Sequence, residues 1–197
     1  MFRPLAALAL AALVAAPAAA CPMTGKNELF MDLIRIGERS YHEPVPLAMP
    51  QIAYTDAAGQ PRTLGDSAGK ALIVTLWHPD CAGCKIDLPR LDAFLEDNPD
   101  LDRDQFVQIS VERLEEGLTG REVGLDDVKG FLDAKAYDAI DRNLDRGNAI
   151  FDAHCLVATP SHLMINREGK VTDVLFGPLR WSESPFADIA RNFLANY

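Results

Sequence analysis

Two cysteines separated by two residues, Cys81 and Cys84, are the side chains of this chain best suited to chemistry. Three residues separate them from the apolar run 71–77, which is typical of a strand buried on both faces. A pair at this spacing can close a small disulfide, and a helix that begins at the first cysteine directs unpaired backbone N–H groups at its sulfur. The pattern predicts a redox-active dithiol with a reactive thiolate at Cys81.

Metal binding is the alternative chemistry for this pair. Thiolates and imidazole suit zinc or Cu(I), so His78 could join Cys81 and Cys84, with Cys155 or His154 completing the site. We keep a metal-binding or metallochaperone module as the second hypothesis, although the strand-to-helix placement suits disulfide exchange better than a closed tetrahedral cage. A solvated loop position is the expectation for His78 itself. The leading interpretation needs no cofactor and no metal.

The elements that must position the pair follow from local patterns. We expect an amphipathic helix over 28–37, an extended connector over 38–50, a hairpin over 51–64, a helix from Cys81 to about Leu95 with Pro89 inside it, a strand over 106–111, a helix around 126–134, a hairpin over 161–176 and a final helix after Pro185. The hairpin over 161–176 is expected at one edge of the sheet. This order predicts a mixed α/β architecture with helices on both faces of a central sheet.

The first twenty residues are typical of a signal peptide, because Arg3 precedes an Ala-rich apolar stretch that ends in three alanines. Cleavage there would place Cys21 at the new N-terminus, where it could carry a lipid anchor or form a disulfide. The expected organisation is a signal peptide over 1–20, an N-terminal helix and connector over 21–48, and one domain over 49–197. The expected location is the periplasm.

Charge argues against nucleic acid as a partner. The chain carries 29 acidic and 19 basic side chains, a formal net charge of −10. Proteins that bind phosphate backbones show clustered Lys and Arg instead. Acidic residues spread along a chain normally serve solubility.

With these elements in order, the chain resembles thioredoxin-like thiol-disulfide oxidoreductases of the TlpA, ResA and CcmG type. The likeness covers roughly residues 49–197: an Asp-x-x-Gly hairpin turn at Asp56, a strand that ends in Leu76-Trp77, the Cys-x-x-Cys motif, Pro89 in the following helix, and Thr159-Pro160 before a terminal hairpin. The resemblance implies a thioredoxin-like fold with an N-terminal hairpin. It also implies that the Thr159–Pro160 bond is cis and lies beside the cysteines.

Site roles follow from the same resemblance. Cys81 is the attacking thiol, Cys84 is the buried resolving thiol, and the two alternate between dithiol and disulfide. Thr159 and Pro160 pair with an extended client segment. Glu112, after the second central strand, is either the proton acceptor for Cys84 or a charge at a strand end that faces water.

Two departures leave the redox direction open. Asp80 stands where the family commonly has Trp, and Ala82-Gly83 replaces the frequent Gly-Pro pair. Three states stay open for Cys155: a buried apolar residue, a disulfide partner of Cys21, or part of a second redox step. The resemblance implies reduction of disulfides in client proteins such as apocytochrome c or copper-site assembly proteins, with electrons exchanged with a membrane partner.

Overall fold

The fold is seen in a computed structural model of the 197-residue chain. It describes residues 39–48 as backbone, and 52–114, 121–154, 156, 158–183 and 186–197 with their side chains. The helix expected over 28–37 lies outside the described residues. Cys21 and Cys155 also lie outside them.

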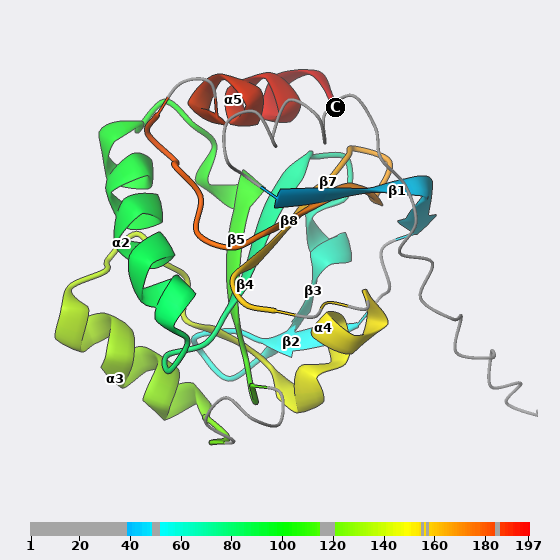
Figure 1. Ribbon diagram of the computed structural model, residues 1–197. Helices are drawn as coiled ribbons and strands as arrows, with labels where there is room; N and C mark the ends of the chain where they lie inside the picture. Colours follow the sequence, from blue (N-terminus) through cyan, green and yellow to red (C-terminus); the bar gives the residue numbers. More distant parts are fainter. Residues whose placement is uncertain (1–38, 49–51, 115–120, 155, 157, 184–185) are drawn as a thin grey trace, which may run out of the picture.

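A single mixed sheet organises the described residues (Figure 1). Its strands are β1 (Arg39–Ala48), β2 (Ala53–Thr55), β3 (Pro61–Thr63), β4 (Leu72–Trp77), β5 (Phe106–Val111), β6 (Asn143–Asp145), β7 (Ser161–Ile165) and β8 (Lys170–Phe176). They lie in the order β1-β8-β7-β4-β5-β6-β2-β3. The pairs β4–β5 and β5–β6 are parallel, whereas the other neighbours are antiparallel.

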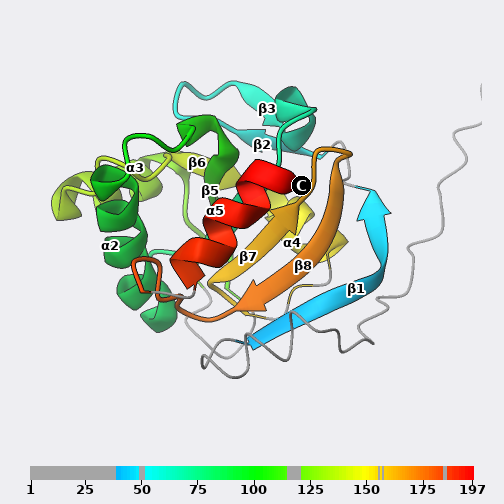
Figure 2. The ribbon, with the colours of Figure 1, turned by 90° about the horizontal axis from the view of Figure 1, so that it is seen from above.

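Helices cover both faces of this sheet. They are α2 (Ala82–Asp97), α3 (Leu125–Lys135), α4 (Ala149–Ala153) and α5 (Phe186–Asn196), with short 3-10 turns at Leu64–Ser67, Arg103–Gln105 and Arg146–Asn148. Figure 2 shows α5 in front of β7 and α4 behind it. The expected mixed architecture is confirmed.

Buried aromatic side chains pack where α2 and α5 meet the central strands. Every residue of β4, β5 and β7 is buried, as the apolar runs predict. On one face, Trp181 lies between Phe94 of α2 and Phe186 of α5, with ring centroids 5.9 and 5.3 Å away. This aromatic packing fixes α2, and with it the Cys pair, against the sheet.

In both expected hairpins, a side-chain oxygen at the start of the turn accepts backbone N–H groups from the same turn. Asp56 accepts the amides of Ala58 and Gln60 in the β2–β3 turn. Asn166 plays the same part between β7 and β8, where its Oδ1 accepts two backbone N–H groups. Such Asx turns leave few alternative connections between the strands.

The edge of the sheet differs from the prediction. The β7–β8 hairpin is not an edge, because β1 pairs antiparallel with β8 and takes the outer position. The expected connector over 38–50 is therefore largely a strand. Its register shifts between His42 and Leu47, the stretch that holds Pro44 and Pro46. Prolines are tolerated at a sheet edge, where a missing N–H leaves no neighbour unpaired.

The short strand β6 was not predicted. Asn143, Leu144 and Asp145 are all buried, but two of the three are polar, so the sequence shows no strand pattern. Asn143 is buried because its Nδ2 donates to the Gln108 carbonyl oxygen at 3.0 Å. Tertiary hydrogen bonds, rather than local preference, make this strand.

Candidate active site

Cys81 caps the N-terminus of α2, immediately after the turn that ends β4. Its backbone N–H donates to the His78 carbonyl oxygen at 3.1 Å, and its sulfur accepts the Cys84 N–H at 3.0 Å. The Cys81 sulfur thus faces an amide at the positive end of the helix. This placement stabilises a thiolate at Cys81.

Cys84 lies one turn further along the helix and is bonded to Cys81 in a disulfide, with the two Cα atoms 5.2 Å apart. Cys81 is 8% exposed and Cys84 is 1% exposed. An incoming thiol or disulfide can therefore reach the first sulfur more readily than the second.

The Thr159–Pro160 loop closes the other side of the pair. The Cys81 sulfur lies 3.1 Å from the Thr159 carbonyl oxygen, and the Thr159–Pro160 peptide bond is cis, as expected. A Cβ placed on Gly83 would lie 3.0 Å from Pro160 Cδ, closer than most real contacts. The absence of a side chain at Gly83 lets the loop approach the cysteines.

An ion pair compensates the charge of Asp80 beside the first cysteine. Arg121 Nε donates to Asp80 Oδ2 at 2.8 Å, and its NH1 group contacts Asp127 of α3 at 3.2 Å. The hydrogen bond from Arg121 holds the pKa of Asp80 below its usual value. Asp80 is therefore a paired carboxylate, and its effect on the Cys81 thiolate is offset by Arg121.

The expectation that His78 is a solvated loop residue is wrong. Its side chain is fully buried, and its Nδ1 accepts the Asp80 backbone N–H at 3.0 Å. Burial lowers the pKa of His78, so the imidazole is held neutral and fixes the turn before Cys81. Among the described residues, no three His, Cys, Asp or Glu side chains gather as a metal site would require.

Glu112 follows β5 at the sheet edge where the parallel strand β4 leads into the cysteine turn, and its side chain binds backbone there. Its carboxylate accepts the Gly147 N–H at 2.7 Å, in the turn between β6 and α4. That contact gives Glu112 a structural task. Its proposed role as proton acceptor for Cys84 stays a prediction.

A buried carboxylate that the sequence reasoning missed lies on the same helix face as Cys84. Asp87 is fully buried, and its Oδ1 accepts the Leu179 N–H at 2.8 Å and the Trp181 indole N–H at 2.9 Å. Burial raises the pKa of Asp87. Residues three apart on a helix have Cβ atoms about 5–6 Å apart, so Asp87 is a neighbour of Cys84. The sequence feature that indicates this role is a carboxylate between Ile86 and Leu88, three residues after the second cysteine.

His162 of β7 extends this polar cluster. Its Nε2 lies 3.8 Å from Asp87 Oδ2, and its Nδ1 lies 3.0 Å from the Thr75 hydroxyl of β4. The imidazole also packs edge to face on Trp181, with ring centroids 5.3 Å apart. Burial lowers the pKa of His162. The sequence predicts His162 only as one residue of a hairpin strand, between Ser161 and Leu163.

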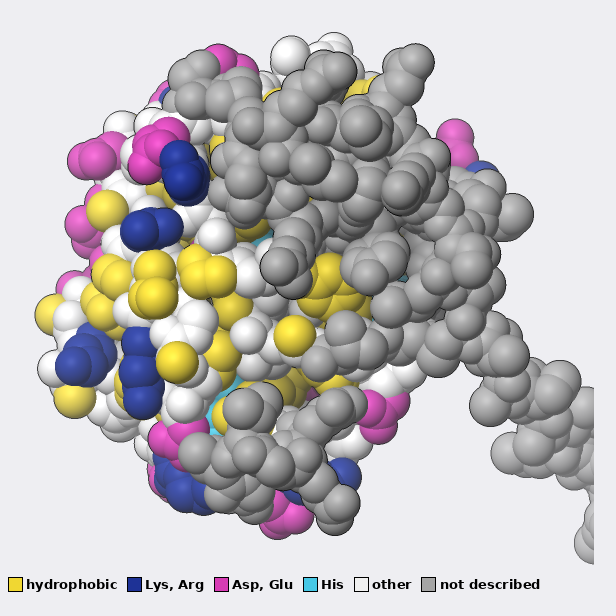
Figure 3. All heavy atoms as spheres, viewed as in Figure 1, with side chains coloured by type: hydrophobic (Ala, Val, Ile, Leu, Met, Phe, Trp, Pro, Cys, Tyr) yellow, Lys and Arg dark blue, Asp and Glu magenta, His cyan; other side chains and the backbone are white. Residues whose placement is uncertain are grey.

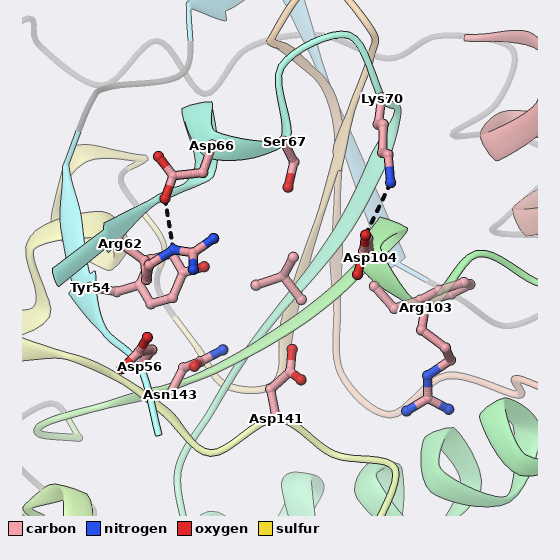
Figure 4. Close-up of a pocket in the computed structure, with 12 residues that line it drawn as sticks. Tyr54, Asp56, Arg62, Asp66, Ser67, Lys70, Arg103, Asp104, Asp141 and Asn143 are labelled. Carbon is pink, nitrogen blue, oxygen red and sulfur yellow. Dashed lines mark hydrogen bonds and ion pairs between the residues drawn. The ribbon is translucent and has the colours of Figure 1, made fainter. Parts of the chain in front are cut away.

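A second polar region lies away from the cysteines. Figure 4 shows Tyr54 and Arg62 of the β2–β3 hairpin on one side of a pocket, and Lys70 and Asp104 on the opposite side. Asp141 and Asn143 also line this pocket, whose volume is about 400 Å³. Burial raises the pKa of Asp141 to about 6. Two of the basic groups that line the pocket, Arg62 and Lys70, are paired with acidic side chains at 2.8–3.1 Å.

Comparison with solved structures places the fold. No protein-family model matches the chain. A thiol:disulfide interchange protein of the thioredoxin family from Chlorobium tepidum is 20% identical with a TM-score of 0.56, over 77% of this chain and 99% of that one. The exposed lipoprotein thioredoxin Etrx1 from Streptococcus pneumoniae is 19% identical with a TM-score of 0.55, over 73% and 98%. A secreted disulfide oxidoreductase from Mycobacterium tuberculosis is 16% identical with a TM-score of 0.51, over 75% and 96%. The chain has a thioredoxin-like fold.

The described part of the chain holds no helix with the length and apolar character needed to span a membrane.

Proposed function

We propose that this chain is an exported thiol-disulfide oxidoreductase of the TlpA, ResA and CcmG type, which reduces disulfides of specific client proteins through Cys81 and Cys84. The observation that carries the proposal is the asymmetry of the pair. Cys81 is the more exposed sulfur, at the helix N-terminus and 3.1 Å from the Thr159 carbonyl, while Cys84 is buried behind it. Nucleophilic and resolving thiols need this difference in access.

The first step is attack on the client. In the reduced protein, the Cys81 thiolate attacks one sulfur of a client disulfide, a bond forms between Cys81 and that sulfur, and the other client sulfur leaves as a thiolate that takes up a proton. The Thr159 backbone beside Cys81 can pair with the client segment like an added strand. Stabilisation of the thiolate at the start of α2 favours this step.

The second step resolves the mixed disulfide. The Cys84 thiol loses its proton, its sulfur attacks Cys81, and the bond from Cys81 to the client breaks. Two electrons have then passed to the client, which leaves with two thiols, and the protein holds the Cys81–Cys84 disulfide. Asp87, one turn from Cys84 on the same buried face, is the group placed to accept the proton.

The surface near the active site suits a polypeptide client. The outer side of α2 exposes Lys85, Ile86 and Arg90, and Ile86 is 50% exposed. Figure 3 shows hydrophobic side chains lying together on this side of the molecule, with Lys and Arg beside them. Although the whole chain is acidic, the first turns of α2 offer apolar and basic contacts.

Export and electron supply are part of the proposal. The Ala-rich stretch 1–20 supports a periplasmic location, and solved structures of similar fold include a secreted protein and an exposed lipoprotein. Cys21 would carry the lipid if the chain is anchored. Because a reductant must be reduced again, a membrane dithiol protein would return two electrons to Cys81 and Cys84. Candidate clients are apocytochrome c and copper-site assembly proteins.

Trapping of mixed disulfides tests the activity. A Cys84→Ser variant should accumulate adducts with clients in the periplasm, because Cys81 attacks and nothing resolves the bond. The control is Cys81→Ser/Cys84→Ser, which keeps Cys21 and Cys155 and reports any adducts that they form. Adducts that are equally abundant in both variants, or absent from both, would reject the proposal.

The reduction potential tests the direction. Equilibration of the full chain with glutathione or dithiothreitol buffers should give a value nearer to about −270 mV, as in thioredoxin, than to about −120 mV, as in DsbA. A strongly oxidising value would contradict a reductive role while leaving the exchange chemistry intact.

A further inference from the structure

The cluster beneath Cys84 joins three elements through polar side chains. Asp87 comes from α2, His162 from β7 and Thr75 from β4, and all three are essentially unexposed. Thr75 and His162 are direct partners across the β4–β7 ladder, so they share the face that α2 covers. Burial of polar groups costs free energy unless they form hydrogen bonds or ion pairs with one another.

The contacts of His162 accommodate both of its protonation states. Its Nε2 lies 3.2 Å from the Gly177 carbonyl oxygen, which can only accept, so this nitrogen carries a hydrogen. In the neutral ring, the bare Nδ1 accepts from the Thr75 hydroxyl at 3.0 Å. A second proton would bind at Nδ1, and the Thr75 hydroxyl would rotate to accept it. A hydroxyl is the side chain that can change roles in this way.

The two oxygens of the Asp87 carboxyl differ in their hydrogen bonds. Oδ1 accepts from Leu179 and Trp181, whereas Oδ2 has no hydrogen-bond partner in the described part of the chain and faces His162 Nε2 at 3.8 Å. A lone carboxylate or a lone imidazolium is costly in this buried setting. The pair avoids a net charge either as a carboxylic acid with a neutral ring or as a carboxylate with an imidazolium.

We propose that His162 is the proton store of the redox site: protonation of its ring at Nδ1, against Thr75, places a positive charge beside Asp87 and so stabilises the carboxylate that accepts the proton of the Cys84 thiol. The inference rests on the proposed function and makes His162 a positioning residue that acts through Asp87. Thr75 holds the stored proton through its hydroxyl.

The proton balance of the step is complete. Before resolution, Asp87 is a carboxylate and His162 an imidazolium. The Cys84 proton moves to Asp87, the Cys84 sulfur bonds to Cys81, and the client thiolate leaves. The imidazolium then gives up its Nδ1 proton to water and the departing client thiolate takes up a proton, which returns the pair to its neutral state. One proton leaves the enzyme for the one that Cys84 lost.

Within the described residues, few charged groups lie around His162. From α2 it faces Asp87, with Arg90 acting on Asp87 from further along the helix. From β4 it faces Thr75, from β8 it pairs with Leu175, and from the segment after β8 it meets Trp181. Asp87 is thus the charged group that acts directly on the ring.

Two-phase thiol release tests the inference. The reduced full chain is mixed with 5,5′-dithiobis(2-nitrobenzoate) in a stopped-flow instrument from pH 5 to 9. Attack by Cys81 releases the first thionitrobenzoate, and attack by Cys84 on the mixed disulfide releases the second. Traces of Cys81→Ser/Cys84→Ser are subtracted to remove any signal from Cys21 and Cys155.

The main variant is His162→Gln, since the amide can bond both Gly177 and Thr75 but cannot hold an extra proton. Its first phase should match wild type, whereas the second phase should move up by about one pH unit and slow about tenfold at neutral pH. Thr75→Val should shift the second phase in the same direction by less, and Thr75→Ser, which restores a hydroxyl, should return it toward wild type.

The failures are distinguishable. If wild type shows no first phase, the proposed function fails. If the first phase is normal and the second phase of His162→Gln follows wild type across the pH range, the proton store is rejected and the function stands. Should His162→Gln not fold, as judged by thermal unfolding, Thr75→Val decides: an unchanged second phase overturns the inference.

Discussion

The Cys81 sulfur lies 3.1 Å from the Thr159 carbonyl oxygen, although 78 residues separate them in the chain. This contact joins the start of α2 to the loop before β7. It brings the attacking sulfur beside a backbone segment that an extended client can use. The spacing between α2 and this loop is therefore a quantity that mutation can test.

Gly83 sets that spacing, and Gly83→Ala should disturb it. The new Cβ would lie 3.0 Å from Pro160 Cδ and 3.6 Å from the Thr159 oxygen. Alanine in place of glycine within a helix normally stabilises by about 0.5–1 kcal/mol. Here the contact should cancel that gain and slow attack on protein disulfides more than attack on small disulfides. Urea unfolding and the two rates are the measurements.

Gly130→Ala is the matched control for this prediction. Gly130 lies inside α3, and a Cβ there meets nothing within 4 Å. The Gly130→Ala variant should therefore show the full increase in the free energy of unfolding expected for alanine in a helix. Its rates of attack on protein disulfides and on small disulfides should be unchanged. Equal stabilisation by both substitutions would show that Gly83 does not limit the approach of the loop.

The Asp80–Arg121 pair should affect the pH at which Cys81 becomes a reactive thiolate. Arg121→Gln leaves the Asp80 charge uncompensated, so the pH midpoint of Cys81 alkylation should rise, and Asp80→Asn should lower it. Both side chains are partly exposed, at 29% and 47%, so shifts of about 0.3–0.7 pH unit are expected at low salt and less at high salt. Arg142→Gln, which breaks a pair with Asp133, is the control. Shifts of the same sign in the Asp80 and Arg121 variants would contradict this account.

The sequence predicted the parts of the site that follow local pattern. The run 71–77 and the Cys-x-x-Cys motif located β4 and the start of α2, and Thr159-Pro160 located the facing loop. It did not predict that His78 is buried, because one loop histidine carries no periodic signal. Nor did it pair Asp87 with His162, since their proximity depends on how α2 packs on β7. Contacts of that kind are created by tertiary structure alone.

Asp141, which lines the pocket of Figure 4, should make the stability of the protein depend on pH. Burial raises the pKa of Asp141 to about 6, well above the usual value for an aspartate. The folded state therefore holds this proton to a higher pH than the unfolded state does. Stability from this group is present at low pH and is lost as pH rises through about 4 to 6.

Asp141→Asn removes that loss. The free energy of unfolding of the variant relative to wild type should increase between pH 4 and pH 7, with an upper limit of about 3 kcal/mol. Urea unfolding at several pH values measures it. Asp104→Asn, an exposed carboxylate of the same pocket, should leave the pH dependence within about 0.5 kcal/mol of wild type. A constant difference for Asp141→Asn across this range would contradict the prediction.

Two substitutions of Asp87 should affect protein stability and the rate of resolution by Cys84 differently. Asp87→Asn keeps an Oδ1 acceptor for Leu179 and Trp181, so the oxidised protein should unfold at nearly the same urea concentration, while resolution by Cys84 slows. Asp87→Ala leaves both donors buried without a partner, at a cost of about 1–3 kcal/mol each. Because Trp181→Phe removes one of these donors, the double variant Asp87→Ala/Trp181→Phe should be less destabilised than the sum of the single variants. Equal loss of stability in Asp87→Asn and Asp87→Ala would mean that the carboxylate charge, and not its acceptor oxygen, holds the segment after β8 against α2.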